Sequence, residues 1–273
     1  MDDVNTIDID MERRSEQAIE LIREARNIAA LTGAGISTEA GIPDFRGPGG
    51  LWGDAEKLNF LSLSGFRRAP EGFYRASRDL IAAISRAEPT PAHRLLVELE
   101  KIGKLKAVAT QNIDGLHTAA GSRAVYELHG TYRTGRCTQC AKAYEMAGFY
   151  AEIEGGRLML PCCSVCAAPI KPDIVLFEEN LPAEAWERSV AAAEACDLML
   201  IFGSSLVVYP AAELPMIAIA GGAKLVIVNM EPTGHDSLAA VTIHGKLGDF
   251  ARLALRLEPV CSTAAGSYTG DVL

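Results

Sequence analysis

The chain alternates short, continuously apolar runs with segments of helical periodicity, and this alternation constrains its fold more than any other feature. The apolar runs are residues 28–31, 105–110, 124–128, 197–202 and 224–228. The segments of helical spacing are residues 15–25, 91–101, 183–195, 211–220 and 247–257. Strands that are apolar on both faces and separated by helices are typical of a parallel sheet covered on both sides. The sequence therefore predicts an α/β fold with a doubly wound parallel sheet.

Length and charge narrow the class of protein. A chain of 273 residues suits a large domain with a small insert and can bury a core without disulfides. The formal net charge of -9 argues against binding to nucleic-acid phosphates. No apolar run is long enough to cross a bilayer, and the N-terminus lacks the apolar stretch of a signal peptide, so we expect a cytoplasmic protein. Residues 1–14 and 258–273 are expected to be flexible termini.

Glycines and polar side chains follow the strands directly, at the edge of a parallel sheet where ligands bind. After the first strand, Gly33 and Gly35 would let backbone N–H groups approach a pyrophosphate closely. Thr38 stands where a dinucleotide-binding fingerprint has its third glycine, so a tight structural turn explains this motif about as well. The polar loop 41–48 follows, and a long loop at a sheet edge is more often functional than idle.

Two segments carry side chains suited to a nucleotide. Within the loop 41–48, Asp44 precedes Phe45 and Arg46, of which the first could cover a planar ring and the second could pair with a phosphate. Segment 111–117 (QNIDGLH) offers amides and a carboxylate suited to ribose hydroxyls and a carboxamide. On its own, this segment slightly favours a structural Asx-type loop.

The remaining strand ends add a histidine, hydroxyl groups and an amide. His129 follows the third strand; a lone histidine is usually structural, but this position also suits a general base. Gly203, Ser204 and Ser205 follow the fourth strand, and Asn229 follows the fifth. Their side chains suit a phosphate or a ribose, and each could equally cap a helix.

Four of the seven cysteines form two C-x-x-C pairs inside a segment, 131–172, that breaks the alternation. These cysteines are Cys137, Cys140, Cys163 and Cys166. Each pair can place two thiolates on one tetrahedral zinc, and a shell of four thiolates leaves no open position. Pairing through Cys162 gives an x3 spacing that suits the metal less well. The sequence therefore predicts an inserted small zinc-ribbon domain whose metal is structural.

The ordered set GAGIS, GIPDFRG, TQNID, HG, paired cysteines, GSSL and VN resembles the sirtuins, the NAD-dependent protein-lysine deacylases. The resemblance spans about residues 15–257, and the segments IVLFEENLP and GSSLVVYPAAELP are similar to bacterial members in particular. It implies a discontinuous Rossmann-like NAD-binding domain at 15–130 and 173–257. The zinc-binding small domain would be 131–172, and part of 47–90 would form a helical insert of the cleft.

The resemblance also implies roles for the matching positions. His129 would be the general base, with Asn112 beside it in the catalytic site. Val175 to Phe177 would form a strand that pairs with the substrate peptide, and Tyr74 would lie in the acyl pocket. The positions expected to hold NAD are Gly33, Ala34, Gly35, Thr38, Asp44, Phe45, Arg46, Gln111, Asn112, Ile113, Asp114, Gly203, Ser204, Ser205, Asn229, Lys246 and Leu247.

The activity implied by the resemblance consumes NAD and yields free lysine, nicotinamide and O-acyl-ADP-ribose. The partners would be proteins that carry acylated lysines, and a monomer is expected. The alternative is a protein mono-ADP-ribosyltransferase that uses the same NAD site. A non-enzymatic zinc-ribbon module leaves the strand-end loops unexplained. A nicotinamide dehydrogenase needs a hydride-transfer constellation that is not visible in the sequence.

Two departures from the family pattern bear on the substrate. Glu178 stands where many members have glycine, which affects peptide affinity or peptide sequence preference. Members that remove succinyl groups carry a Tyr-x-x-Arg pair, whereas Tyr74 is followed here by Ser77 in the arginine's place. Arg78 lies one helix step on, turned by about 100° from that direction. We therefore expect a preference for acetyl or other uncharged acyl groups.

Overall fold

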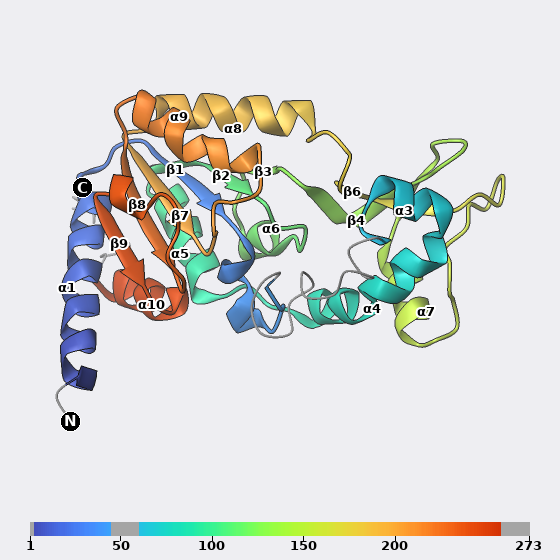
Figure 1. The fold of residues 1–273 in the computed structure, drawn as a ribbon, viewed down its shortest axis with the longest axis horizontal. Coiled ribbons are helices and arrows are strands. Elements are labelled where there is room, and N and C mark those ends of the chain that lie inside the picture. The colour runs from blue at the N-terminus through green and yellow to red at the C-terminus, as the bar shows by residue number, and fades with distance from the viewer. Residues whose placement is uncertain (1–2, 45–59, 258–273) are drawn as a thin grey trace, which may run out of the picture.

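The computed structural model describes residues 3–44 and 60–257, which form a larger and a smaller part (Figure 1). The larger part is built on a six-stranded parallel sheet in the order β3-β2-β1-β7-β8-β9. Its strands are β1 (Ile28–Thr32), β2 (Leu105–Thr110), β3 (Val125–Glu127), β7 (Leu198–Phe202), β8 (Lys224–Asn229) and β9 (Val241–His244). The strand order runs outward from β1 to β3 and then returns to β7 on the other side of β1. This order confirms the predicted doubly wound sheet, whose switch point lies between β1 and β7.

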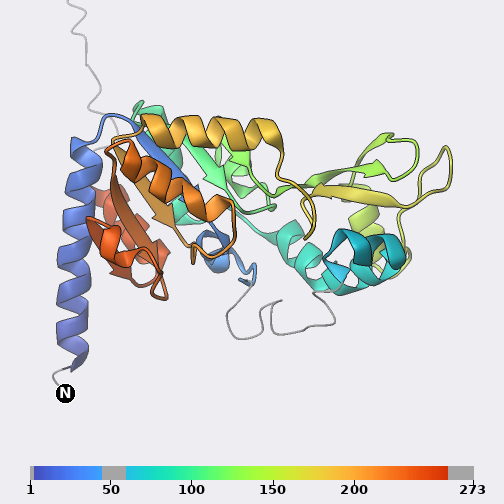
Figure 2. The ribbon, with the colours of Figure 1, turned by 45° about the horizontal axis from the view of Figure 1, so that its top comes forward.

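Helices cover both faces of this sheet (Figures 1 and 2). One face packs against α1 (Asp3–Glu24), α5 (Pro91–Lys101) and α10 (Leu247–Leu257). The other face packs against α8 (Ala183–Ala195) and α9 (Leu214–Ala220). Every residue of β1 and β7 is buried, which explains why these strands are continuously apolar in the sequence.

The N-terminal helix is longer than the sequence predicts. The segment expected to be helical begins at residue 15, whereas α1 begins at Asp3 and therefore includes residues 3–14. Ser15 lies inside the helix and donates its hydroxyl to the carbonyl of Met11 (2.7 Å). In the later turns Ile19 and Ile22 are buried in the core, against which Met11 also packs.

The smaller part combines two stretches of the chain. An antiparallel sheet in the order β5-β4-β6 contains β4 (Gly130–Cys137), β5 (Ala143–Glu145) and β6 (Ile170–Ile174). Three helices, α3 (Leu63–Arg68), α4 (Pro70–Arg86) and α7 (Ala147–Glu154), share a core with this sheet. Phe73 packs edge-to-face on Phe66 and Tyr74, with ring centroids 5.3 and 5.1 Å apart. The helical insert expected within 47–90 thus joins the cysteine-bearing segment.

Short helical elements lie in the loops that follow the strands of the larger part. They are α6 (Leu116–Ala120) and the 3-10 turns η1 (Ala34–Ile36), η2 (Thr38–Ala40), η4 (Ala211–Glu213) and η5 (Asp236–Leu238). The helix expected at 211–220 starts as η4 and becomes α9, which has Pro215 in its first turn. Among the described residues, no helix combines the length and the apolar character needed to cross a membrane.

Candidate active site

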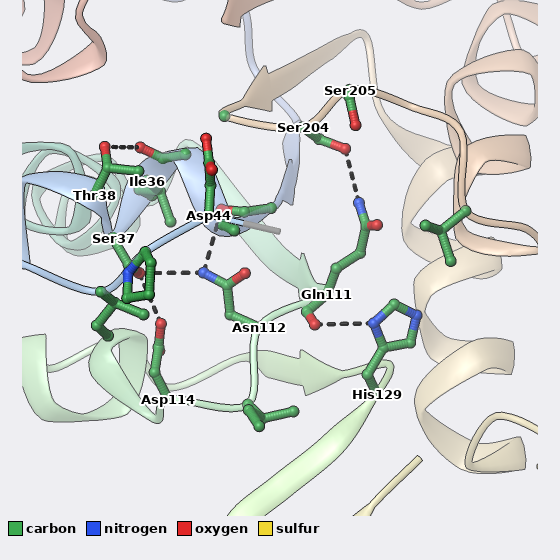
Figure 3. A pocket seen from close by; sticks show the side chains of 18 of the residues that line it. Ile36, Ser37, Thr38, Asp44, Gln111, Asn112, Asp114, His129, Ser204 and Ser205 are labelled. Carbon is green, nitrogen blue, oxygen red and sulfur yellow. Dashed lines mark hydrogen bonds between the residues drawn. The ribbon is translucent and has the colours of Figure 1, made fainter. Parts of the chain in front are cut away.

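A cleft of about 1420 Å³ lies at the carboxyl ends of the central strands, and residues of both parts line it (Figure 3). It brings together all the described residues expected to hold NAD, as well as His129, Val175 and Phe177. The NAD-binding candidates that line the cleft are Gly33, Ala34, Gly35, Thr38, Asp44, Gln111, Asn112, Ile113, Asp114, Gly203, Ser204, Ser205, Asn229, Lys246 and Leu247. The predictions for Phe45 and Arg46 fall outside the described residues.

The glycines after β1 are required by the close approach of another loop. A Cβ on Gly33 would lie 2.7 Å from the carbonyl oxygen of Gly203, and one on Gly35 would lie 2.6 Å from the Cα of Gly203. The N–H of Gly33 donates to the carbonyl of Phe202 (3.1 Å), and that of Gly35 to the carbonyl of Gly203 (2.9 Å). These two hydrogen bonds hold the loop after β1 closely against the loop after β7.

Asn112 is held by a buried hydrogen-bonded chain that crosses from β2 to η1 (Figure 3). Its Nδ2 donates to the carbonyl of Gly33 and to Oγ of Ser37, both at 3.2 Å. The Ser37 hydroxyl donates in turn to Oδ2 of Asp114 (2.7 Å), whose Oδ1 accepts the N–H of Leu116 (2.9 Å). Burial raises the pKa of Asp114, although the bonds from Leu116 and Ser37 favour the carboxylate. The chain fixes the orientation of the Asn112 amide before any ligand binds.

His129 has the protonation state that a general base needs. Its Nδ1 lies 2.9 Å from the carbonyl oxygen of Gln111, beside which the ring lies in Figure 3. A carbonyl only accepts hydrogen bonds, so Nδ1 carries the proton and Nε2 of the neutral ring is unprotonated. Burial lowers the pKa of His129, and the bond to Gln111 offsets this only in part. The ring is therefore neutral near pH 7, with a basic Nε2.

Hydrogen bonds hold the loops after β2, β7 and β8 in place around the cleft. Nε2 of Gln111 donates to Oγ of Ser204 (2.8 Å), and this bond joins the loop after β2 to the loop after β7. The same hydroxyl accepts the N–H of Leu206 (3.3 Å). Nδ2 of Asn229 donates to the carbonyl of Glu231 (2.7 Å). These contacts leave the loops pre-shaped along one wall of the cleft.

The four cysteines predicted to bind zinc come together in the smaller part. Each offers one sulfur, and these sulfurs lie within 4.8 Å of one another. Sγ of Cys137 accepts the N–H groups of Gln139 and Cys140, both at 3.4 Å, which stabilises a thiolate. Cys162 is not part of this cluster, and its backbone forms an isolated antiparallel β-bridge with Pro169. The donors fit one tetrahedral zinc. The length of β4, about 25 Å at strand spacing, separates this cluster from His129. A shell of four thiolates leaves no open position, so the metal is structural.

Comparison with known proteins identifies the family. A model described as the Sir2 family matches residues 33–210. NAD-dependent protein deacylase 2 of Archaeoglobus fulgidus is 44% identical, over 88% of this chain and 94% of that protein. The chain belongs to the Sir2 family, the sirtuins. NAD-dependent protein deacetylase of Thermotoga maritima is 42% identical, over 88% of this chain and 96% of its own length.

Solved sirtuin structures share this fold. One, described as the structural basis for the mechanism and regulation of Sir2 enzymes, has a TM-score of 0.83 and 43% identity, and covers 90% of this chain and 97% of its own. Another, bound to a propionylated peptide, has a TM-score of 0.80 and 40% identity, with 88% and 97% covered. The resemblance seen in the sequence motifs is thereby confirmed over most of the chain.

One sirtuin site residue expected from the sequence lies outside the cleft. Tyr74 is fully buried in the core of the smaller part, where its hydroxyl donates to the carbonyl of Ile170 (2.6 Å). The expectation that it contacts the acyl group is therefore not met, because α4 turns this side chain toward β6. The residues of α4 that do line the cleft are Phe73, Ser77, Leu80, Ile81 and Ile84. Their helical spacing is the sequence signal that would have identified this face.

The segment expected to pair with the peptide differs from a regular strand. β6 ends at Ile174, and in the segment beyond it Phe177 forms a single parallel bridge with Ser62. The N–H of Phe177 donates to Leu61 (3.1 Å), and its carbonyl accepts the N–H of Leu63 (3.0 Å). Phe177 therefore offers its side chain, rather than these backbone groups, to a peptide in the cleft.

Proposed function

We propose that this sirtuin is an NAD-dependent protein-lysine deacylase. The single observation that carries the proposal is the tautomer of His129, whose unprotonated Nε2 stands in the same cleft as the fixed Asn112 amide. Support also comes from the relatives named NAD-dependent protein deacylase and deacetylase. A Sir2 structure described as containing a p53 peptide and NAD⁺, 42% identical to this chain, supports binding of both ligands by this fold.

The residues of the cleft suit this chemistry. NAD, as co-substrate, would supply the ribose carbon from which nicotinamide leaves and the hydroxyl to which the acyl group is transferred. Nε2 of His129 would take the proton of a ribose hydroxyl, since the Gln111 carbonyl keeps the ring's own proton on Nδ1. The buried chain through Asn112, Ser37 and Asp114 would hold the nicotinamide end without reorganising. The products would be lysine, nicotinamide and O-acyl-ADP-ribose.

Mass spectrometry separates this activity from the alternative. Deacylation removes mass from an acetyl-lysine peptide in an NAD-dependent manner and releases nicotinamide in equal amount. Mono-ADP-ribosylation at the same NAD site would add mass to an acceptor protein instead. NAD-dependent loss of the acetyl group without an ADP-ribose adduct supports the proposal, and an adduct on an intact acetyl peptide would replace it with the alternative.

We also propose that the acyl group is uncharged. The cleft-facing side of α4 presents Phe73, Leu80, Ile81 and Ile84, and Ser77 occupies the place of the arginine found in succinyl-removing members. Nη2 of Arg78 donates to the carbonyl of Glu154 (2.8 Å), which holds this cation on α7. An apolar wall accepts acetyl and propionyl groups but leaves a succinyl carboxylate unpaired. Equal kcat/KM for acetyl-lysine and succinyl-lysine peptides would refute this preference.

Location and assembly follow as smaller proposals. Cys137, Cys140, Cys163 and Cys166 form a metal-ligand set, which is typical of a reducing compartment, where disulfides are rare. We therefore propose that the protein is cytoplasmic, which fractionation of cells would test. We also propose that it acts as a monomer on acylated-lysine proteins, which sedimentation at working concentration would test.

A further inference from the structure

Glu178 adopts a backbone conformation that side-chain-bearing residues rarely take. Its φ angle is +77°, in the left-handed region that glycine enters without a steric penalty. Many sirtuins have glycine at this position. Because the substitution introduces a steric cost beside the cleft, other contacts must stabilise this conformation.

The carboxylate of Glu178 supplies these contacts by binding the start of α3. Oε2 accepts the N–H of Ser64 (3.0 Å), and Oε1 accepts the hydroxyl of the same residue (2.9 Å). The backbone bonds of Phe177 to Leu61 and Leu63 lie next to this contact. Four hydrogen bonds, two from the Phe177 backbone and two from the Glu178 carboxylate, therefore join segment 175–179 to residues 61–64.

The segment also lines the cleft, where apolar side chains are exposed. Phe177 is 48% exposed, and Val207 and Tyr209, which line the same cleft from the loop after β7, are 49% and 65% exposed. An extended peptide that buries these three side chains requires segment 175–179 to stand at a fixed distance from loop 207–209. The bonds to Ser64 set that position, because they hold the left-handed backbone conformation at Glu178.

We propose that Glu178 is a positioning residue that holds the peptide-facing segment against α3, and that this contact sets the affinity for the acyl-lysine peptide. The inference rests on the proposed deacylase function. A competing role is attraction of basic side chains in the peptide by the exposed carboxylate. The positioning role is favoured because both oxygens of Glu178 are already bound to Ser64.

Three substitutions at one position separate the contact from the backbone conformation and from the charge. Glu178→Gly keeps φ +77° accessible but removes the contact, and Glu178→Ala removes both. Glu178→Gln keeps both bonds, because its amide oxygen accepts the Ser64 N–H and its NH₂ group donates to the hydroxyl. We expect Gly and Ala to raise the KM for a neutral acetyl-lysine peptide about tenfold, the equivalent of one or two ordinary hydrogen bonds. The kcat and the KM for NAD should not change, and Gln should behave as the wild type.

Two outcomes would overturn the proposal. A wild-type KM for Glu178→Gly with the neutral peptide would show that only the backbone conformation matters. A loss of affinity in Glu178→Gln confined to arginine-flanked peptides would show that the carboxylate acts on charge. Hydrogen exchange at the Ser64 amide gives a readout that does not depend on turnover: it should accelerate in the Gly and Ala variants but not in Gln. If the wild type turns over no peptide, the deacylase proposal fails while this exchange pattern still tests the contact.

Discussion

Acidification should destabilise this protein through two histidines that are buried and neutral. The rings of His93 and His117 pack together, tilted by 58° with their centroids 4.6 Å apart, next to the strands that form the NAD-site loops. Burial lowers the pKa of His93 to about 2, with a further contribution from His117, and burial lowers the pKa of His117 to about 4. The N–H of Thr90 donates to Nδ1 of His93 (3.2 Å), so this nitrogen must stay unprotonated to keep the bond. Nε2 of His117 lies 2.8 Å from Oγ1 of Thr32.

The magnitude follows from proton linkage. Both folded-state pKa values lie below the unfolded value of 6.5, so the unfolded chain binds more protons as the pH falls. The stabilisation is complete above about pH 6.5 and is lost progressively below it. At 1.36 kcal/mol per pKa unit, each histidine removes about 2 kcal/mol of stability between pH 7.5 and pH 5. Together they account for about 4 kcal/mol, a large share of the stability of an ordinary domain.

Urea unfolding followed by circular dichroism at pH 7.5, 6 and 5 measures this loss. His117→Gln keeps a polar group for Thr32 but cannot titrate, so it should lose about 2 kcal/mol less than the wild type over this range. Other titrating groups, including the zinc thiolates and the buried Asp114, cancel when the variant is compared with the wild type at each pH. The same pH slope in His117→Gln and the wild type would refute the argument.

Three further predictions concern the cleft and the metal. Burial lowers the pKa of His129, so the acid limb of the kcat/KM profile should fall below about pH 6.5 in steady-state kinetics; a limb centred above pH 7 would contradict its role as the base. Gly35→Ala should lower the free energy of unfolding, measured in urea, by about 2–3 kcal/mol because its Cβ would meet Gly203. Gly148→Ala, with open space around its Cβ, should lower it far less, and equal decreases would refute the close approach. Metal analysis should find one zinc per chain, and Cys163→Ser should lower the melting temperature; no bound zinc, or an unchanged melting temperature, would contradict the structural role.

The larger part of the fold could be predicted because its buried strands and helices show clear apolar patterns in the sequence. β7 and β8 are covered on both faces, so each appears as an uninterrupted apolar run. α5 has the predicted bounds, since Pro91 begins it and the preceding Thr90 caps it. The strands of the smaller sheet show no such pattern, because β4 (GTYRTGRC) is mostly polar. Its pairing with β6 also joins residues far apart in the chain, which the sequence does not indicate.

The site was located by its position after the strands, but its chemistry depends on contacts between loops. The sequence indicates that His129 and Gln111 follow neighbouring strands, but the tautomer depends on one carbonyl turned toward one ring nitrogen. The same limit applies to Gly35, whose N–H donates to the carbonyl of Gly203, a contact that the sequence does not indicate. Tyr74 matches the tyrosine of the family's Tyr-x-x-Arg pair, but that match does not indicate that its hydroxyl donates to the carbonyl of Ile170 in the core of the smaller part.

The most direct test of the central claim is mass spectrometry of an acetyl-lysine peptide incubated with the purified protein, with and without NAD. The account predicts NAD-dependent loss of the acetyl group, with equal amounts of nicotinamide and O-acetyl-ADP-ribose. His129→Ala should abolish this turnover while the variant remains folded and zinc-loaded. An unchanged peptide with the folded wild type, or undiminished turnover by His129→Ala, would contradict the account.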